Sequence, residues 1–276
     1  MYHKQALTIG INSYTPKRLS LKPCINDAND LSASLQSVGF QVKNVIDGDL
    51  RTIRTVTQQF IKSIQPGAVV VFYFSGHGVQ SDGNNYLIPS DAIGVCADNI
   101  QSTAIDAQQL IDAMYERKPK LIVCILDCCR TSAPDAPIDA NPMKRVLAGT
   151  RPGLAPMQAP PSTIVVYACA ANDTASPRSK NGRNSLYTYY LLKHMRTPNV
   201  DVETLLKRVA ADVQRESNNE QIPYRYSSCN EMIYIIDQQE PRRHVQPEPQ
   251  APLLPKKPHI KRPVRKSHGF VLLSFQ

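Results

Sequence analysis

Short, nearly continuous apolar runs recur along the chain and alternate with segments of helical periodicity. There are six of these runs, and most of them are rich in Val and Ile, which is typical of strands that are covered on both faces. The predicted strands are Ala6–Ile11, Phe40–Val45, Ala68–Phe74, Lys120–Leu126, Ser162–Ala168 and Glu231–Ile236.

Apolar positions that recur every three or four residues predict helices between these strands. Gly39 and Pro66-Gly67 follow two of them, as residues that end helices should. The alternation of strand and helix predicts an α/β sandwich with about six mainly parallel strands and helices on both faces. The predicted helices are Asp27–Val38, Thr52–Ile64, Asp106–Arg117, Leu186–Met195 and Val202–Glu216.

Two proline-rich segments break this alternation. Residues 131–161 hold seven prolines and almost no periodicity, which predicts a long exposed loop after the fourth strand. Residues 239–276 hold another seven prolines with interleaved charge, which predicts a flexible or extended tail. The sequence therefore predicts one domain, residues 1–238, followed by a basic tail, residues 239–276.

The net charge of +9 is concentrated in this tail. From residue 239 onward there are eight Lys or Arg and two Glu, a balance of +6, which leaves +3 for the preceding 238 residues. Such a tail could bind nucleic acid or an acidic surface, although a solvated extension is the commoner outcome. No aromatic residues are interleaved with the basic residues 242–266, so base stacking has no support.

Cysteine usage and the N-terminus indicate the compartment. The seven cysteines are an odd number and form no C-x-x-C pair, which favours free thiols in a reducing environment. The apolar run Ala6–Ile11 is too short for a signal peptide and far too short to cross a bilayer. We expect a cytoplasmic protein without a transmembrane segment.

Candidate chemistry follows the third and fourth predicted strands. His77 stands between Gly76 and Gly78 after the third strand, and Cys129 follows the fourth. Sites in open α/β sheets form beyond the carboxyl ends of strands, so we expect a nucleophile and a base at one edge. The imidazole would promote the reactive thiolate, and the amides of Gly78 and Cys129 could face an oxyanion. The glycines would permit unusual backbone angles and a close approach of substrate.

The adjacent cysteines 128 and 129 need a choice between them. Neighbouring side chains on a strand diverge, and the step of two residues from Asp127 favours Cys129 as the nucleophile. For the other cysteines, the simpler interpretation is a small buried apolar residue. A purely structural role for His77 is the alternative there, but a position between glycines favours access over packing.

The motifs Ser75-Gly76-His77-Gly78 and Asp127-Cys128-Cys129-Arg130, with His77 and Cys129 52 residues apart, resemble those of caspase-like cysteine peptidases. The acidic residue two positions before the cysteine resembles metacaspases and paracaspases in particular. Further similarity spans residues 5–237 and lies in Cys24–Ala28, Asn85–Asp91 and Gly182–Thr188. The last two of these motifs resemble bacterial members of the family in particular.

The resemblance implies a three-layer caspase-like sandwich, with a p20-like part in residues 1–130 and a p10-like part in residues 162–238. It also implies that the pocket for the residue before the cleaved bond is lined by Cys24, Asp27, Ser75 and Asp127. The two carboxylates would favour Arg or Lys through charge-assisted hydrogen bonds. Asp27 could also simply begin the helix that follows, and the two roles are compatible.

Two features depart from the metacaspase pattern. Residues 79–104 contain only three acids, Asp82, Asp91 and Asp98, whereas many metacaspases carry a long acidic insert there and require calcium. We therefore expect no calcium dependence, and we predict no metal site or other cofactor. The helix-opening His-Ser-Gly that usually follows the metacaspase cysteine is replaced by Arg130-Thr131-Ser132.

The predicted function is a cysteine endopeptidase that cleaves protein or peptide substrates after Arg or Lys. We also expect self-cleavage in the 131–161 loop, which contains Lys144, Arg145 and Arg151. One alternative is a catalytically idle caspase-like scaffold or signalling module that recruits partners through its tail. Another is a nucleic-acid-binding protein that acts through residues 242–266.

Overall fold

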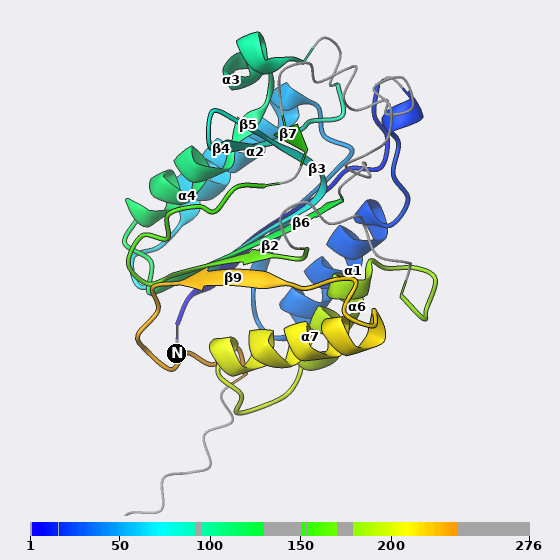
Figure 1. Ribbon diagram of the computed structural model, residues 1–276. Coiled ribbons are helices and arrows are strands. Elements are labelled where there is room, and N and C mark those ends of the chain that lie inside the picture. Colours follow the sequence, from blue (N-terminus) through cyan, green and yellow to red (C-terminus); the bar gives the residue numbers. More distant parts are fainter. Residues whose placement is uncertain are drawn as a thin grey trace, which may run out of the picture. The chain divides into compact units, whose positions relative to one another are not determined.

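The fold is taken from a computed structural model (Figure 1). The side chains of Arg18, Cys129, Arg151 and Pro152 are outside the description. The predicted tail and residues 131–150 of the predicted loop also lie outside the described residues. The described residues are 2–15, 17–91, 95–129, 151–152, 154–169 and 179–236.

A six-stranded sheet forms the centre of the domain in the order β2-β1-β3-β6-β8-β9. The first five strands are parallel, and β9 runs antiparallel to β8 at one edge. The short strands β4, β5 and β7 form an antiparallel extension around the far end of β3. The bounds are β1 Lys4–Gly10, β2 Gln41–Ile46, β3 Val69–Ser81, β4 Asn84–Leu87, β5 Ile105–Asp106, β6 Leu121–Cys129, β7 Arg151–Pro152, β8 Thr163–Tyr167 and β9 Tyr224–Ser227.

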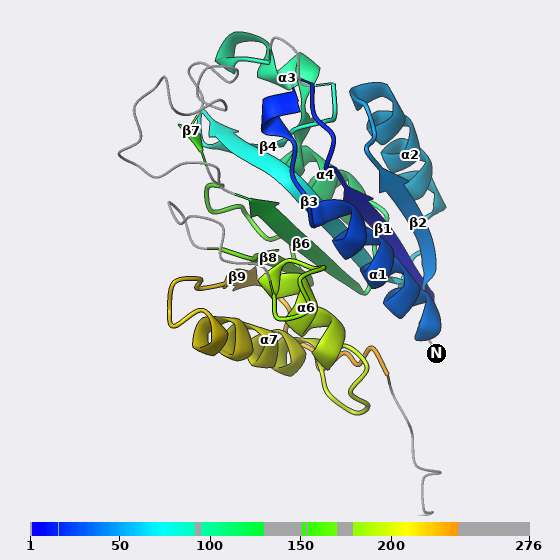
Figure 2. The ribbon, with the colours of Figure 1, turned by 90° about the vertical axis from the view of Figure 1, so that its right-hand side faces the viewer.

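Helices cover both faces of this sheet. Helices α2 and α4 lie on one face, and α1, α6 and α7 lie on the other (Figures 1 and 2). This arrangement confirms the predicted α/β sandwich of mainly parallel strands with helices on both faces. The helices are α1 Cys24–Ser37, α2 Leu50–Ser63, α3 Ile100–Thr103, α4 Ala107–Tyr115, α6 Leu186–His194 and α7 Val202–Glu216, with single 3-10 turns η1 Lys17–Leu19 and η2 Ala97–Asn99.

The central strand β3 shows why these apolar runs form buried strands. Its side chains alternate between two apolar clusters, with Phe72 and Phe74 toward α2 and α4, and Val71 and Tyr73 toward α1 and α6. Burying one such large apolar side chain contributes roughly 1.5–3 kcal/mol. A strand covered on both faces is therefore a rigid support for the residues at its end.

The sixth predicted strand is wrong. Residues 231–236 form no strand, and the edge strand is instead Tyr224–Ser227. This segment alternates aromatic and polar residues and is half-exposed, so it lacks the continuous apolar run of the inner strands. Ile233 and Ile235, which suggested a strand, are buried in the cluster beside α7.

The last part of the predicted exposed loop packs on the domain. Arg151–Pro152 pairs with β3 as the short strand β7. Leu154 and Met157 are buried in the apolar cluster on the α2 and α4 side. These two apolar residues stand among prolines, so the segment lacks the periodicity that identifies a helix or an inner strand.

Candidate active site

His77 lies inside a strand rather than after one. Strand β3 continues past the predicted end at Phe74 to Ser81, and the His77 side chain is only 1% exposed. In the register between β3 and β6, His77 pairs with Cys129, the last residue of β6. Because neighbouring strands lie about 4.8 Å apart, the predicted base and nucleophile are backbone neighbours. The side chain of Cys129 is not described.

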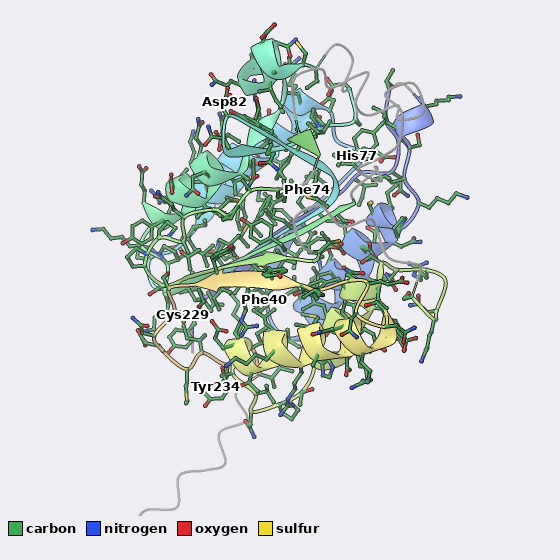
Figure 3. The ribbon with its side chains drawn as sticks, in the orientation of Figure 1. Phe40, Phe74, His77, Asp82, Cys229 and Tyr234 are labelled. Atoms are coloured by element: carbon green, nitrogen blue, oxygen red, sulfur yellow. The ribbon has the colours of Figure 1, made fainter. Side chains whose placement is uncertain are left out.

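The loop after β1 contacts Nε2 of this histidine. His77 Nε2 lies 2.6 Å from the backbone carbonyl oxygen of Leu19, in η1, and Figure 3 shows His77 beside the loop that carries η1. A carbonyl oxygen only accepts hydrogen bonds, so this contact requires a proton on Nε2. Nδ1 is then the basic nitrogen of the neutral ring, which is the form that can take a proton from a thiol.

The two glycines beside His77 serve packing, which corrects the expectation of unusual backbone angles. Neither Gly76 nor Gly78 is among the residues with positive φ. A Cβ atom on Gly76 would lie 2.6 Å from the Tyr14 hydroxyl oxygen, and one on Gly78 would lie 2.8 Å from Cys128 Sγ. These glycines therefore allow neighbouring side chains to approach the strand that holds His77.

Two carboxylates, Asp27 and Asp127, are buried near each other on the α1 and α6 side of the sheet. Their exposed fractions are 0% and 4%. Asp27 is in the first turn of α1, and Asp127 stands two residues before Cys129 on β6. Ser75 Oγ donates a 3.4 Å hydrogen bond to Asp27 Oδ2. The structure thus brings together three of the four predicted pocket residues, and the fourth, Cys24, is buried one turn before Asp27 on α1.

The interpretation of Asp27 as a helix cap does not hold. Helix α1 begins at Cys24 and its N-cap residue is Pro23, so Asp27 is already within the helix. Its carboxylate turns to the start of α6 instead, where Oδ1 accepts a 3.0 Å hydrogen bond from the backbone N–H of Ser185.

Neutral donors surround the carboxylate pair. The Ser185 hydroxyl donates to Asp127 Oδ2 at 2.5 Å, and the Thr188 hydroxyl donates to the same oxygen at 2.9 Å. The Tyr73 hydroxyl adds a 3.3 Å contact to that oxygen. Among the described residues, neither Asp27 nor Asp127 forms an ion pair. The nearby Arg183 forms its ion pair with Asp30 instead.

Burial and mutual repulsion oppose ionisation of this pair. Burial, followed by the charge of Asp127, raises the pKa of Asp27 from 3.8 to about 8. Burial also raises the pKa of Asp127. Two buried like charges are unfavourable without a compensating cation, and a bound cation would favour the ionised form of both. A positively charged group bound beside the two carboxylates would therefore be electrostatically favourable.

Several residues of the site carried no prediction. Leu19 acts through a backbone atom, which no side-chain pattern identifies. Ser185 and Thr188 lie at the start of a correctly predicted helix, where a serine before the first apolar residue is a recognisable N-cap. Tyr14 contacts His77, and its signal is a lone aromatic residue in an otherwise polar loop that follows the first strand.

The mainly parallel sheet, the histidine and cysteine on neighbouring strands, and the two buried carboxylates are the features that the resemblance to caspase-like proteins led us to expect. The family model described as "Caspase domain" matches residues 3–234. The chain belongs to this caspase family.

Relatives with described functions match about half of the chain. A segment of 127 residues is 28% identical to the human mucosa-associated lymphoid tissue lymphoma translocation protein 1, and covers 46% of this chain and 15% of that protein. A paracaspase from Dictyostelium discoideum is 34% identical over 128 residues, which cover 44% of this chain and 30% of the paracaspase. Metacaspase-5 from Trypanosoma cruzi is 25% identical over 152 residues, which cover 47% of this chain and 33% of that protein. The matched segments thus span at most about a third of each of these relatives.

Solved structures support the fold. Caspase-1 from Spodoptera frugiperda superposes with a TM-score of 0.58 at 17% identity, over 86% of this chain and 91% of the other. A protein from Geobacter sulfurreducens superposes with a TM-score of 0.59 at 15% identity, over 83% of this chain and 94% of the other. Separately, none of the helices in the described residues has the length and apolar character needed to cross a membrane.

Proposed function

We propose that this chain is a cysteine endopeptidase that cleaves proteins or peptides after arginine or lysine. Cys129 is the nucleophile and His77 is the general base. Asp27 and Asp127 bind the basic side chain before the cleaved bond, with Ser75 and Cys24 in the wall of the pocket.

The proposed reaction is acyl transfer through a thioester. His77 Nδ1 accepts the thiol proton of Cys129, and the resulting thiolate sulfur bonds to the substrate carbonyl carbon. The backbone amides of Gly78 and Cys129 stabilise the oxyanion, and the histidine returns its proton to the departing amine. Water, deprotonated by His77, then hydrolyses the thioester and releases the free thiol. The proton on Nε2 that the Leu19 carbonyl requires supports this assignment of Nδ1.

The buried carboxylate pair is the observation that carries the proposed specificity. Asp27 and Asp127 are held by neutral donors at the sheet edge where His77 and Cys129 pair. A guanidinium or ammonium group would offset the repulsion between the two carboxylates and gain charge-assisted hydrogen bonds. A substrate aspartate would add a third negative charge to the same pocket.

Cleavage of matched fluorogenic peptides that differ only in a final Arg, Lys or Asp tests this proposal. We expect the wild-type chain to cleave the Arg and Lys peptides and Cys129→Ala to cleave none. Asp127→Asn should raise KM for the Arg peptide by one to two orders of magnitude, because it leaves a single acid in the pocket. A preference for Asp would overturn the pocket assignment. No activity on any peptide would favour the idle scaffold.

Self-processing in the 131–161 loop is part of the same proposal. Of its three basic residues, Arg151 is in β7 and pairs with Gln80 of β3. A backbone that is already paired does not enter a second cleft, so we expect the cut after Lys144 or Arg145. Incubation of the wild-type chain beside Cys129→Ala, followed by mass spectrometry of the fragments, tests this. Identical intact bands in both samples would contradict self-cleavage.

A further inference from the structure

The backbone N–H of His77 needs a hydrogen-bond partner that the sheet does not provide. Strand β1 ends at Gly10, and the last bond from this side runs from the Ile11 N–H to the Ser75 carbonyl at 3.0 Å. Alternate residues of a parallel strand bond to the same neighbour, so His77 is the next residue that should bond on this side. After Ile11 the chain leaves the sheet, as shown by the Asn12 N–H, which bonds to Asp47 Oδ1 at 2.7 Å.

The Tyr14 hydroxyl takes the place of the missing strand. The His77 N–H donates to the Tyr14 hydroxyl oxygen at 2.9 Å. That hydroxyl can donate in turn to the Ile88 carbonyl, at 3.5 Å. Tyr14 is only 2% exposed, so this bond satisfies a buried amide that would otherwise be costly to leave unpaired.

The ring of Tyr14 also contacts the imidazole itself. The centroids of the two rings lie 4.5 Å apart, with an angle of 51° between their planes. An aromatic ring at this distance restricts the rotation of the imidazole and favours its protonated form. One side chain therefore contacts both the backbone and the ring of His77.

The segment that carries Tyr14 is closed on itself and anchored. We call residues 12–15 and 17–21 the histidine clamp. The Leu21 N–H bonds to the Asn12 carbonyl at 2.8 Å, and the Thr15 N–H bonds to the Ser90 carbonyl at 2.9 Å. The same segment supplies the Leu19 carbonyl that holds Nε2. The clamp thus contacts His77 at its backbone, at its ring face and at one ring nitrogen.

Gly76 makes room for this contact. A Cβ atom at that position would approach the Tyr14 hydroxyl to 2.6 Å, which is closer than real Cβ contacts allow. Tyr14 belongs to the apolar cluster on the α2 and α4 side, whereas Asp127 contacts Tyr73 and Thr188 on the α6 side. Changes at Tyr14 should therefore affect the base and leave the pocket for the basic side chain in place.

We propose that Tyr14 is a positioning residue that holds His77 in the orientation needed to activate Cys129, an inference that rests on the proposed peptidase function. Its hydroxyl fixes the backbone of His77, and its ring fixes the plane of the imidazole. In this role it acts through the histidine.

Two measurements on the full chain test this proposal, with Tyr14→Phe as the main variant. The first compares kcat and KM on the Arg peptide. We expect kcat to fall roughly tenfold, as for the loss of one partner of a buried amide, with KM changed by less than about twofold. The matched control is Tyr190→Phe, which removes another phenol hydroxyl, one that bonds to Glu216 on the opposite face of the sheet from Tyr14. It should leave kcat unchanged.

The second measurement needs no peptide substrate. It follows the rate at which iodoacetamide alkylates Cys129 at neutral pH, read by mass spectrometry of the peptide that contains this residue. If Tyr14 holds the base, the rate in Tyr14→Phe falls toward that of His77→Ala. A lack of peptidase activity in every variant would sink the proposed function, while this readout would still decide the role of Tyr14.

A second pair of variants tests the proposal if Tyr14→Phe folds poorly. It compares Gly76→Ala with the double variant that carries Gly76→Ala and Tyr14→Phe. The new methyl group collides with the Tyr14 hydroxyl, so removal of that hydroxyl should restore part of the alkylation rate lost in Gly76→Ala. Rates equal to wild type in Tyr14→Phe would overturn the proposal. A double variant in which the two losses simply multiply would overturn it as well.

Discussion

Asp27, which we propose binds the basic side chain of the substrate, destabilises the folded state when it is ionised. Its carboxylate is fully buried at the start of α1, and its pKa is raised by burial and by the charge of Asp127. A group whose pKa is raised on folding stabilises the folded state fully below its unfolded pKa, near 3.8 here. That contribution is lost as the pH rises through the folded pKa, which is about 8.

The variant Asp27→Asn should therefore be more stable than the wild type at alkaline pH, and it should raise KM for the Arg peptide as proposed for Asp127→Asn. We expect its Tm to exceed that of the wild type by about 5 °C at pH 9, with the difference shrinking as the pH falls toward 4. Thermal unfolding from pH 4 to pH 9 measures this. Asp82→Asn, at an exposed turn, is the matched control and should show no such trend. A Tm difference independent of pH would contradict the electrostatic explanation.

At the scale of elements, the segment after β7 contributes to the core and supports the site. Leu154 is buried, and its Cδ2 atom would lie 3.0 Å from a Cβ on Gly78, the residue whose amide we assign to the oxyanion. The segment is also held by Asn85, whose side chain bonds to both the N–H and the carbonyl of Ala155.

Truncation of this leucine tests how firmly the segment belongs to the domain. Leu154→Ala should reduce the free energy of unfolding by about 2–4 kcal/mol, because it removes buried methyl groups and leaves a cavity. Denaturant unfolding gives the value. Met232→Ala, at a side chain that is 77% exposed, removes a large apolar group without such a loss. Equal stability of both variants would mean that the segment is not part of the core.

The inner strands and most of the helices could be predicted from the sequence, because burial on both faces produces continuous apolar runs. The edge strand Tyr224–Ser227 could not, because an edge strand needs neither a continuous run nor full burial. The site residues likewise divide into those that the sequence could predict and those that it could not. Parallel strands bring their carboxyl ends to one edge, so the sequence could place His77 and Cys129 together. The Leu19 carbonyl and the Tyr14 hydroxyl depend on the path of a loop, which has no such periodic signal.

At the scale of the whole molecule, the expectation that no calcium is required becomes a prediction. Residues 79–104 contain only three acids, and one of them, Asp91, already accepts a hydrogen bond from the Leu50 N–H. We propose that excess EGTA leaves kcat/KM on the Arg peptide unchanged within about twofold, because neither the dyad nor the pocket needs a cation other than the substrate. A metacaspase that requires calcium, assayed in parallel, is the control. A large loss that added calcium reverses would refute this prediction.

The basic tail gives a second prediction at this scale. Six of the nine net positive charges lie in residues 239–276, so we propose that binding to nucleic acid or to acidic vesicles depends on them. A chain that ends at residue 238 should keep its activity on Arg peptides and lose any binding that weakens with salt. Fluorescence anisotropy with a labelled oligonucleotide, and sedimentation with anionic vesicles, measure this. Equal binding by both chains would exclude the tail as the binding element.

The histidine clamp precedes helix α1, so residues 12–15 and 17–27 contain both the support of the proposed base and one carboxylate of the proposed pocket. In the proposed function, catalysis and selectivity therefore both depend on this one short stretch of chain. Exchanging substrate selectivity between members of this family by transferring loops would therefore require the transfer of this whole stretch. A recombination point inside it would join a pocket from one parent to a base held by the other.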